Sequence, residues 1–194
     1  ICYLIKSHYK KVGKAISKLN DTIHETPLSD EHYNNNKPDT TNLTAIQLVS
    51  GFNSLGIHTM LSVLSNFPWL YKNFIFIGVS VVDSNSFRDK EELEKHRVKT
   101  ITDLNKYVEY AKKLGIAAEY IYHVSTYVIE AATDICIQTA KEFPNSTVFA
   151  GKLMFQQERF YHKLLHNDTS FNIQKNLQHY GITTVIMPVT IELD

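Results

Sequence analysis

The sequence has few of the residues that would mark several common protein classes. It contains two cysteines, five prolines and seven glycines in 194 residues, and twenty basic side chains balance twenty acidic ones. Cys2 and Cys136 cannot make a disulfide framework, so a reducing compartment fits best. The zero formal net charge argues against nucleic acid as a partner. The apolar start, Ile1–Ile5, is far shorter than the roughly twenty residues of a membrane-spanning helix.

Motifs of familiar catalytic sites are missing as well. The chain has no Gly-x-Ser-x-Gly elbow, no His-Glu-x-x-His and no paired Cys-x-x-Cys. Gly51 and Gly56 have the spacing that begins a phosphate-binding P-loop, but an isoleucine and His58 stand where that loop needs Lys and Ser or Thr. His162 and His166 are four residues apart without an evident Glu or Cys partner. We therefore expect no enzyme activity, no metal site and no cofactor.

Charge is unevenly spread along the chain. Residues 1–20 carry five lysines and no acid, residues 21–42 carry five acids and one lysine, and residues 43–194 carry fourteen bases and fifteen acids. An apolar end followed by clustered lysines is typical of the cytoplasmic exit of a transmembrane helix, and Tyr3 and Tyr9 suit its interface. The residues leave open a free amphipathic helix that packs on the domain or frays.

The pattern divides the chain into three segments. Residues 1–19 are an apolar start and a basic segment, either the end of a transmembrane helix with its juxtamembrane lysines or a free amphipathic helix. Residues 20–42 are rich in turn-forming residues and read as a polar linker without a core of its own. Residues 43–194 are expected to form one folded domain.

Within this domain, short apolar runs alternate with helical patterns. The predicted strands are Leu43–Val49, Asn73–Asp83, Ala117–Val124, Thr147–Met154 and Thr183–Ile191. The predicted helices are about Leu55–Phe67, Asp89–Leu114 and Thr126–Glu142, with one or two more inside Glu158–Tyr180. This alternation predicts an α/β fold with a doubly wound, mainly parallel five-stranded sheet and helices on both faces.

Two predictions concern the edges of this sheet. The fifth predicted strand is long and apolar and is placed at an edge, so we expect a homodimer through it or through the helices beside it. Ligands of such sheets bind beyond the carboxyl ends of the strands. Candidate ligand-binding residues at those ends are Gly51, Asn53, Ser54, Gly56, His58, Asp83, Ser84 and Gly151.

These candidates have a simpler interpretation, which we favour. The turn before the first helix offers free N–H groups as a general anion site. Gly51 and Gly56 would equally serve turn geometry and close packing of the helix on the sheet. Asp83 and Ser84 are of the residue types that cap helices and form turns.

Several spaced segments resemble a known group of proteins. They are Gly51–Thr59, Phe67-Pro68, Lys72–Phe76, Val82–Ser84, Glu142–Asn145, Phe149–Leu153 and Leu164–Asp168. Together they resemble the cytosolic C-terminal domain of bacterial amino acid permeases of the amino acid–polyamine–organocation transporter superfamily, over about Leu43 to Pro188.

That resemblance implies a regulatory or assembly domain of a secondary transporter at the cytoplasmic face of the bacterial inner membrane. The domain's partner would then be its own transmembrane transporter domain, and Lys6–Lys18 could touch anionic lipid.

The domain also resembles the universal stress protein fold. In that family an Asp just after the first strand contacts a nucleotide, and a Gly-rich loop after the fourth strand holds its phosphates. Here Gly51 stands near the position of that Asp. The loop after the fourth strand, Lys152–Glu158, contains no glycine, and Gly151 precedes it. Without glycines the backbone cannot approach a triphosphate closely. This resemblance supports the fold, argues against ATP binding of that kind, and gives a small-ligand or nucleotide-sensing domain as the alternative function.

Overall fold

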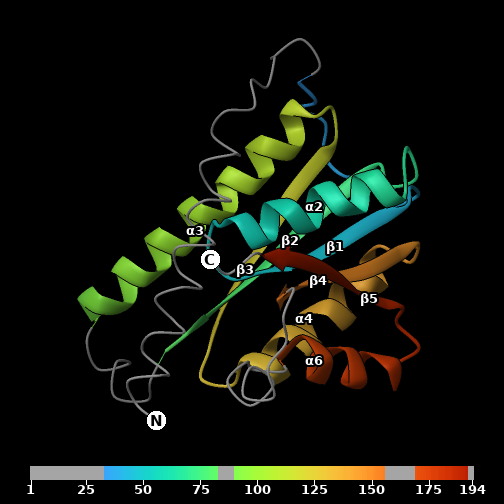
Figure 1. Cartoon of the computed structure of the whole chain (residues 1–194). Coiled ribbons are helices and arrows are strands. Elements are labelled where there is room, and N and C mark those ends of the chain that lie inside the picture. The colour runs from blue at the N-terminus through green and yellow to red at the C-terminus, as the bar shows by residue number, and fades with distance from the viewer. Residues whose placement is uncertain (1–32, 83–89, 156–168, 192–194) are drawn as a thin grey trace.

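The structure is a computed structural model that describes residues 33–82, 90–155 and 169–191. Its strands are β1 (Thr44–Val49), β2 (Asn73–Val81), β3 (Ala117–Ser125), β4 (Ser146–Phe155) and β5 (Thr184–Ile191). Its helices are α2 (Ser54–Asn66), α3 (Lys90–Lys113), α4 (Val128–Glu142) and α6 (Thr169–Gln178) (Figure 1). The predicted order of strands and helices is confirmed, and the described ends lie within two residues of the predicted ones.

The five strands form one sheet in the order β3-β2-β1-β4-β5. Every neighbouring pair is parallel, with Thr44 opposite Asn73 on one side of β1 and opposite Ser146 on the other. The predicted doubly wound parallel sheet and the edge position of the fifth strand are therefore confirmed. Whether β5 pairs with a second copy stays a prediction.

Alternate residues of each strand build two cores, one on each face of the sheet. Phe74 and Phe76 of β2 belong to the core under α2 and α3, whereas Ile75 and Ile77 belong to the core under α4 and α6. A strand buried on both faces is mostly apolar, and β2 has no polar side chain from Phe74 to Val79. Cys136 of α4 is fully buried in the second core.

Glycine and proline end the helices at the amino end of the sheet. Gly115 has φ +80° two residues after α3, and Gly181 has φ +71° three residues after α6. Both values lie in the left-handed region that favours glycine at a helix C-terminus. Pro144 follows α4 by two residues and cannot continue a helix.

Residues 33–42 have no helix or strand and run along the amino end of the sheet. The Asn34 backbone N–H donates to the carbonyl of Lys112, and the Asn73 side chain donates to the carbonyl of Asp39. This part of the predicted linker is therefore tied to the fold by hydrogen bonds rather than by a core of its own.

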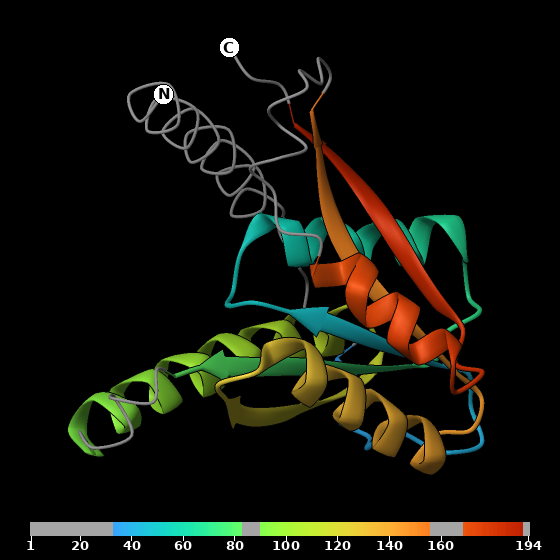
Figure 2. The same ribbon diagram turned by 90° about the horizontal axis from the view of Figure 1, so that it is seen from below.

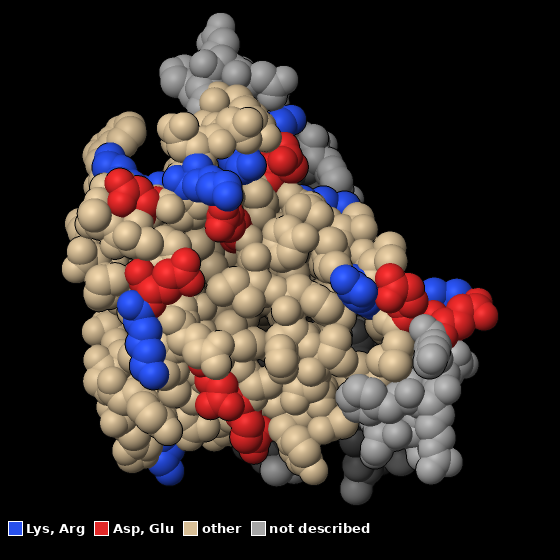
Figure 3. Space-filling view, turned by 180° about the vertical axis from the view of Figure 1, so that it is seen from behind, with Lys and Arg blue, Asp and Glu red and all other residues tan. Residues whose placement is uncertain are grey.

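Charged side chains are interspersed on the surface. Seen from behind the view of Figure 1, acidic and basic side chains alternate around a broad uncharged centre (Figure 3). Among the described helices, none is both long enough and apolar enough to cross a membrane.

Some of the sequence predictions lie outside the described residues. They are the segment 1–19, the lipid contact at Lys6–Lys18, most of the linker, the candidates Asp83 and Ser84, and the start of the helical region Glu158–Tyr180.

Candidate ligand cavity

A cavity of about 400 Å³ lies at the carboxyl ends of β1 and β4. The chain builds the sheet outward from β1 to β3, then crosses over and continues with β4 and β5. The boundary between β1 and β4 is thus the topological switch point, where open α/β sheets bind ligands. The cavity lies where the sequence predicted a site.

The unequal lengths of β1 and β4 open this cavity. The last residue of β4 that pairs with β1 is Ala150, but β4 continues to Phe155 alongside β5. Figure 2 shows these two strands running on together beyond the end of β1. On the side where β1 has ended, the stretch after Ala150 has no neighbouring strand among the described residues, and Gly151, Lys152 and Leu153 line the cavity.

The cavity walls are mostly apolar, with a polar rim. Aliphatic side chains from β1, β2, α4 and α6 form the walls, including Leu48, Ile77, Val128 and Ile173. Polar groups come from the β1–α2 turn, from α2, from β4 and from the first turn of α6: they are Ser50, Asn53, Thr59, Lys152, Thr169 and Ser170. An apolar pocket with a few convergent polar groups is the usual composition of a small-molecule site.

Gly151 lets β4 pass close beneath α2. A β-carbon at this position would overlap the hydroxyl oxygen of Thr59 and lie 3.0 Å from a methyl carbon of Leu55. Any larger residue would push α2 away from the sheet and change the cavity. Gly151 therefore shapes the site through its small size.

The β1–α2 turn is fixed by its own hydrogen bonds. Gly51 has φ +70°, which a side chain would strain. Asn53 is the N-cap of α2, and its side-chain oxygen accepts from the Gly56 N–H at 3.0 Å. One of the free N–H groups that could have bound an anion is thus already occupied.

Tyr107 of α3 clamps the same turn from the other side. Its hydroxyl lies 3.0 Å from the carbonyl oxygen of Gly51 and accepts from the Asn53 N–H at 3.1 Å. Burial raises the pKa of Tyr107 to about 12, so the hydroxyl keeps its proton and stays a donor at neutral pH. The interpretation of Gly51 as a turn residue is therefore confirmed, whereas Gly56 packs closely against Tyr107 of α3 rather than against the sheet.

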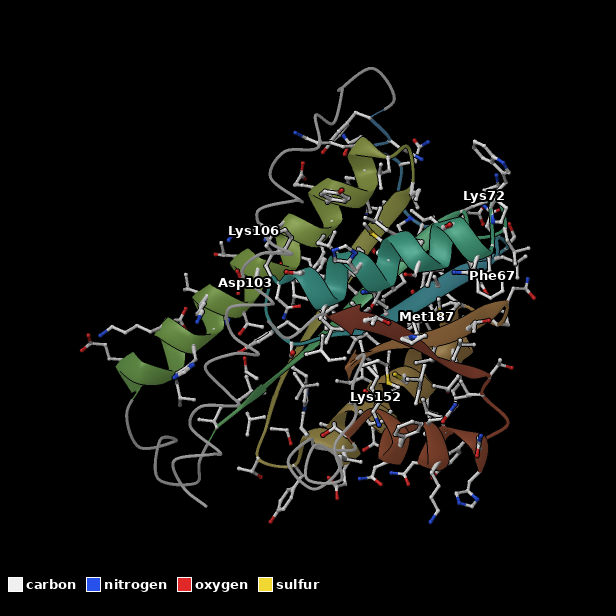
Figure 4. All side chains as sticks on the ribbon, in the orientation of Figure 1. Phe67, Lys72, Asp103, Lys106, Lys152 and Met187 are labelled. Atoms are coloured by element: carbon white, nitrogen blue, oxygen red, sulfur yellow. The ribbon has the colours of Figure 1, made fainter. Side chains whose placement is uncertain are left out.

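Lys152 lies on the other side of the cavity. Its Nζ is 4.0 Å from the ring centroid of Phe171, at the start of α6 (Figure 4). A cation over an aromatic face is held electrostatically by the ring quadrupole. Next to Phe171, the Ser170 hydroxyl donates to the carbonyl of Gly151 at 3.4 Å and links α6 to β4. A cation and the N-terminus of α6 thus meet at one point on the rim.

The cavity takes up only some of the predicted site residues. Asn53, Gly56 and Gly151 line it. Gly51, Ser54 and His58 belong to the same turn and helix but are not among its lining residues.

His58 lies on α2 without a role in the cavity. Its Nε2 is buried and has no hydrogen-bond partner among the described residues. Burial lowers the pKa of His58 below 6.5, which favours the neutral ring.

Three features that sequence reasoning did not identify are Lys152 as a site residue, the Thr169–Phe171 turn, and Gln47. Gln47 is fully buried on β1, and its amide donates to the carbonyl of Gly56 at 2.7 Å. The sequence did offer a signal for Gln47, because a glutamine inside a mostly apolar strand needs a buried hydrogen-bond partner. The position of Lys152 in the cavity depends on how far β4 extends beyond the end of β1. The local sequence of β4 does not indicate this difference in length.

The described lining of the cavity combines apolar walls with hydrogen-bonding groups and one positive charge. Its described lining residues include one basic side chain and no Asp, Glu or His. They therefore offer hydrogen-bond donors and a positive charge, and none of them is a carboxylate or imidazole for proton transfer. Among the described residues, no group of three or more His, Cys, Asp and Glu is arranged to hold a metal ion.

Comparisons with known proteins place the fold. No protein-family model matches the sequence, and no curated protein matches it significantly. A solved structure described as a protein from the universal stress protein family of Burkholderia pseudomallei superposes with a TM-score of 0.54 at 11% sequence identity. The match covers 78% of this chain and 100% of that chain. With the sheet order described above, the chain has a universal stress protein-like α/β fold.

Proposed function

We propose that this domain binds a small anionic molecule in the cavity at the carboxyl ends of β1 and β4 and acts as a ligand-sensing domain. The observation that carries the proposal is Lys152, which stands on the part of β4 that outruns β1, beside the N-terminus of α6. It is the one basic side chain among the described lining residues. A ligand with a negative group at the rim and an apolar body in the walls matches this arrangement.

The size and charge of the cavity favour a singly or doubly charged ligand over a triphosphate. A volume of about 400 Å³ is near the lower end of the usual range for small-molecule sites. One lysine offsets little of the charge of ATP. Pairing with β5 as far as Phe155 also engages the backbone groups on that side of β4, which a phosphate-binding loop would leave free. We expect AMP or a small carboxylate to bind in preference to ATP.

The resemblance to permease domains suggests a context for this sensing. In it, residues 43–194 would lie on the cytoplasmic side of a transporter, and ligand binding would regulate transport or assembly. The lysine-rich residues 6–18 that follow an apolar start support this context.

A thermal-shift panel on the full chain tests the binding proposal. Inorganic phosphate, AMP, ATP, amino acids and short carboxylates are compared with neutral and cationic analogues of the same body. A ligand at about one hundred times its Kd should stabilise the fold by about 2.7 kcal/mol, or roughly 5 to 10 °C in Tm for a chain of this size. The proposal predicts a response to anions alone, and equal shifts for charged and neutral analogues would contradict it.

Variants at two lysines separate the site from general charge. Lys152→Met keeps the length of the side chain and removes its positive charge. Lys175→Met removes a lysine from the last turn of α6. Lys175 is not among the residues that line the cavity. The first variant should lose the anion response and the second should keep it.

A further inference from the structure

The turn between α2 and β2 presents the only tryptophan of the chain to solvent. Trp69 is 86% exposed and has φ +64°, and it is the one residue other than glycine with a positive φ in the described part of the chain. The Leu70 N–H donates to the carbonyl of Phe67 at 3.2 Å and closes a four-residue turn. Pro68 is second in this turn and Trp69 is third, as in a type II turn.

The third position of a type II turn needs a positive φ and is normally glycine. A bulky aromatic residue there is a true outlier and costs about 1–2 kcal/mol. Folding alone gives no reason to retain it, because Trp69 contributes almost no buried surface in return. Strained residues of this kind point to a function of the side chain.

The neighbours of Trp69 in the turn hold it in this position. The rings of Phe67 and Tyr71 pack against Phe149 of β4, at 6.1 Å and 5.3 Å between centroids. These two anchors fix the ends of the turn in the core while Trp69 projects between them. Leu70, 42% exposed, follows directly, and the carbonyl of Leu43, 41% exposed, accepts from the Lys72 N–H. We call Trp69, Leu70, Leu43 and Lys72 the Trp69 surface.

The Trp69 surface lies at the opposite end of the sheet from the cavity. It adjoins the amino ends of β1 and β2, whereas Lys152 stands beyond the carboxyl end of β1. Lys72 and Lys152 are labelled at these two ends in Figure 4. The described chain also begins at the amino end, because Tyr33 donates its hydroxyl hydrogen to Glu109 near the end of α3.

The composition of the Trp69 surface fits a lipid bilayer better than a protein. Three exposed apolar side chains are far fewer than the twenty or so residues per side of a stable protein interface. A bilayer requires no complementary shape, and tryptophan is the residue that prefers its interface. The two segments that meet here, residues 37–43 and 67–72, carry Lys37 and Lys72 against Asp39 alone, so their net charge favours anionic headgroups.

We propose that the Trp69 surface docks on an anionic membrane, with the indole of Trp69 inserted at the headgroup level. The domain then lies with the amino end of its sheet against the bilayer and its cavity facing away. This inference does not depend on ligand binding in the cavity.

The single tryptophan makes the test direct, because fluorescence excited where tyrosine does not absorb reports Trp69 alone. The full chain is titrated with vesicles of equimolar phosphatidylglycerol and phosphatidylcholine, and with vesicles of phosphatidylcholine only. The expected result is a blue shift of Trp69 emission with the anionic vesicles and quenching by brominated lipid. The basic segment Lys6–Lys18 is a second possible lipid contact, so vesicle binding that leaves Trp69 emission unchanged would overturn the proposal.

Two variants separate docking from folding. Trp69→Gly puts the favoured residue into the turn, so its Tm should be unchanged or higher while vesicle binding weakens about tenfold. The double variant Trp69→Tyr and Tyr127→Trp moves the probe to an exposed position after β3, at the carboxyl end, where vesicles should cause no shift.

Other occupants give different results in the same titration. A blue shift that grows with protein concentration in the absence of vesicles would indicate a second copy of the chain and overturn the proposal. Unchanged vesicle binding by Trp69→Gly would overturn it as well.

Discussion

The Tyr107 ring occupies the space that a β-carbon on Gly56 would need. Such a carbon would lie 2.6 Å from Cζ of Tyr107 and closer still to its hydroxyl oxygen. The Tyr107 hydroxyl in turn donates to the Gly51 carbonyl and accepts from the Asn53 N–H, on either side of Phe52 in the β1–α2 turn. The mouth of the cavity therefore depends on a contact between α2 and α3, made by two residues more than fifty positions apart in the sequence.

Replacing Gly56 by alanine should destabilise the fold. On helix propensity alone, alanine inside α2 would stabilise by up to about 1 kcal/mol. The overlap with Tyr107 should outweigh this gain, with a net loss of about 1–3 kcal/mol in urea unfolding. Ser65→Ala, at an exposed position of the same helix, is the control and should be slightly stabilising. A Gly56→Ala variant as stable as the parent would disprove the contact.

Removing the Tyr107 hydroxyl should loosen the turn without emptying the core. Tyr107→Phe keeps the ring that stacks on Phe76 at 5.2 Å between centroids. It leaves the Asn53 N–H without its partner, so we expect a loss of about 1–2 kcal/mol of unfolding free energy. Tyr180→Phe, whose ring is 63% exposed, should change stability little. Equal losses of unfolding free energy in the two variants would contradict a stabilising role for the Tyr107 hydroxyl in the β1–α2 turn.

Protonation of His58 should make the fold less stable at acidic pH. Burial lowers its folded pKa below 6.5, so the unfolded chain binds more protons than the folded one in the interval between the two values. Stability is therefore fully present above about pH 6.5 and falls as the pH drops through the folded pKa. His58→Leu should flatten the dependence of Tm on pH between about 7 and 5. His179→Leu, at an exposed position, controls for the loss of a histidine, and a parallel slope in all three proteins would refute the prediction.

Cys136 should be inert while the protein is folded. It is fully buried in the α4–α6 core, and burial raises the pKa of its thiol to about 12. The thiolate is the reactive form, so a Cys2→Ser protein should react with a thiol reagent at neutral pH only after urea unfolds it. Rapid reaction of the folded protein would mean that α4 opens readily.

The order of the strands and helices was predictable because the central strands are mostly apolar on both faces. The run from Phe74 to Ile77 has no polar side chain, which favours a strand buried on both faces, and it lies in the middle of the sheet. The interpretation of Gly51 as a turn residue succeeded for a similar reason, since a glycine between a strand and a helix marks backbone geometry.

The site itself was predictable only in part. The sheet topology pointed to the end of the sheet where the cavity lies, and Asn53, Gly56 and Gly151 line that cavity. The importance of Lys152 depends on three elements that are distant in sequence, namely the end of β1, the extension of β4 and the start of α6. Trp69 was missed because Pro68 is equally suited to a type I and a type II turn. Only the type II turn gives the next residue a positive φ, as Trp69 has.

A calorimetric titration of the full chain with AMP, compared between the natural sequence and Lys152→Met, decides most directly whether the cavity is an anion site. The result expected is one binding site per chain, with affinity at least about tenfold weaker in the variant, because a charged hydrogen-bonding contact is worth about 1.5–3 kcal/mol. Small carboxylates from the thermal-shift panel are titrated in the same way. Binding of equal strength in the two proteins, or no heat from any anion, would contradict the proposal that Lys152 and this cavity form a ligand site.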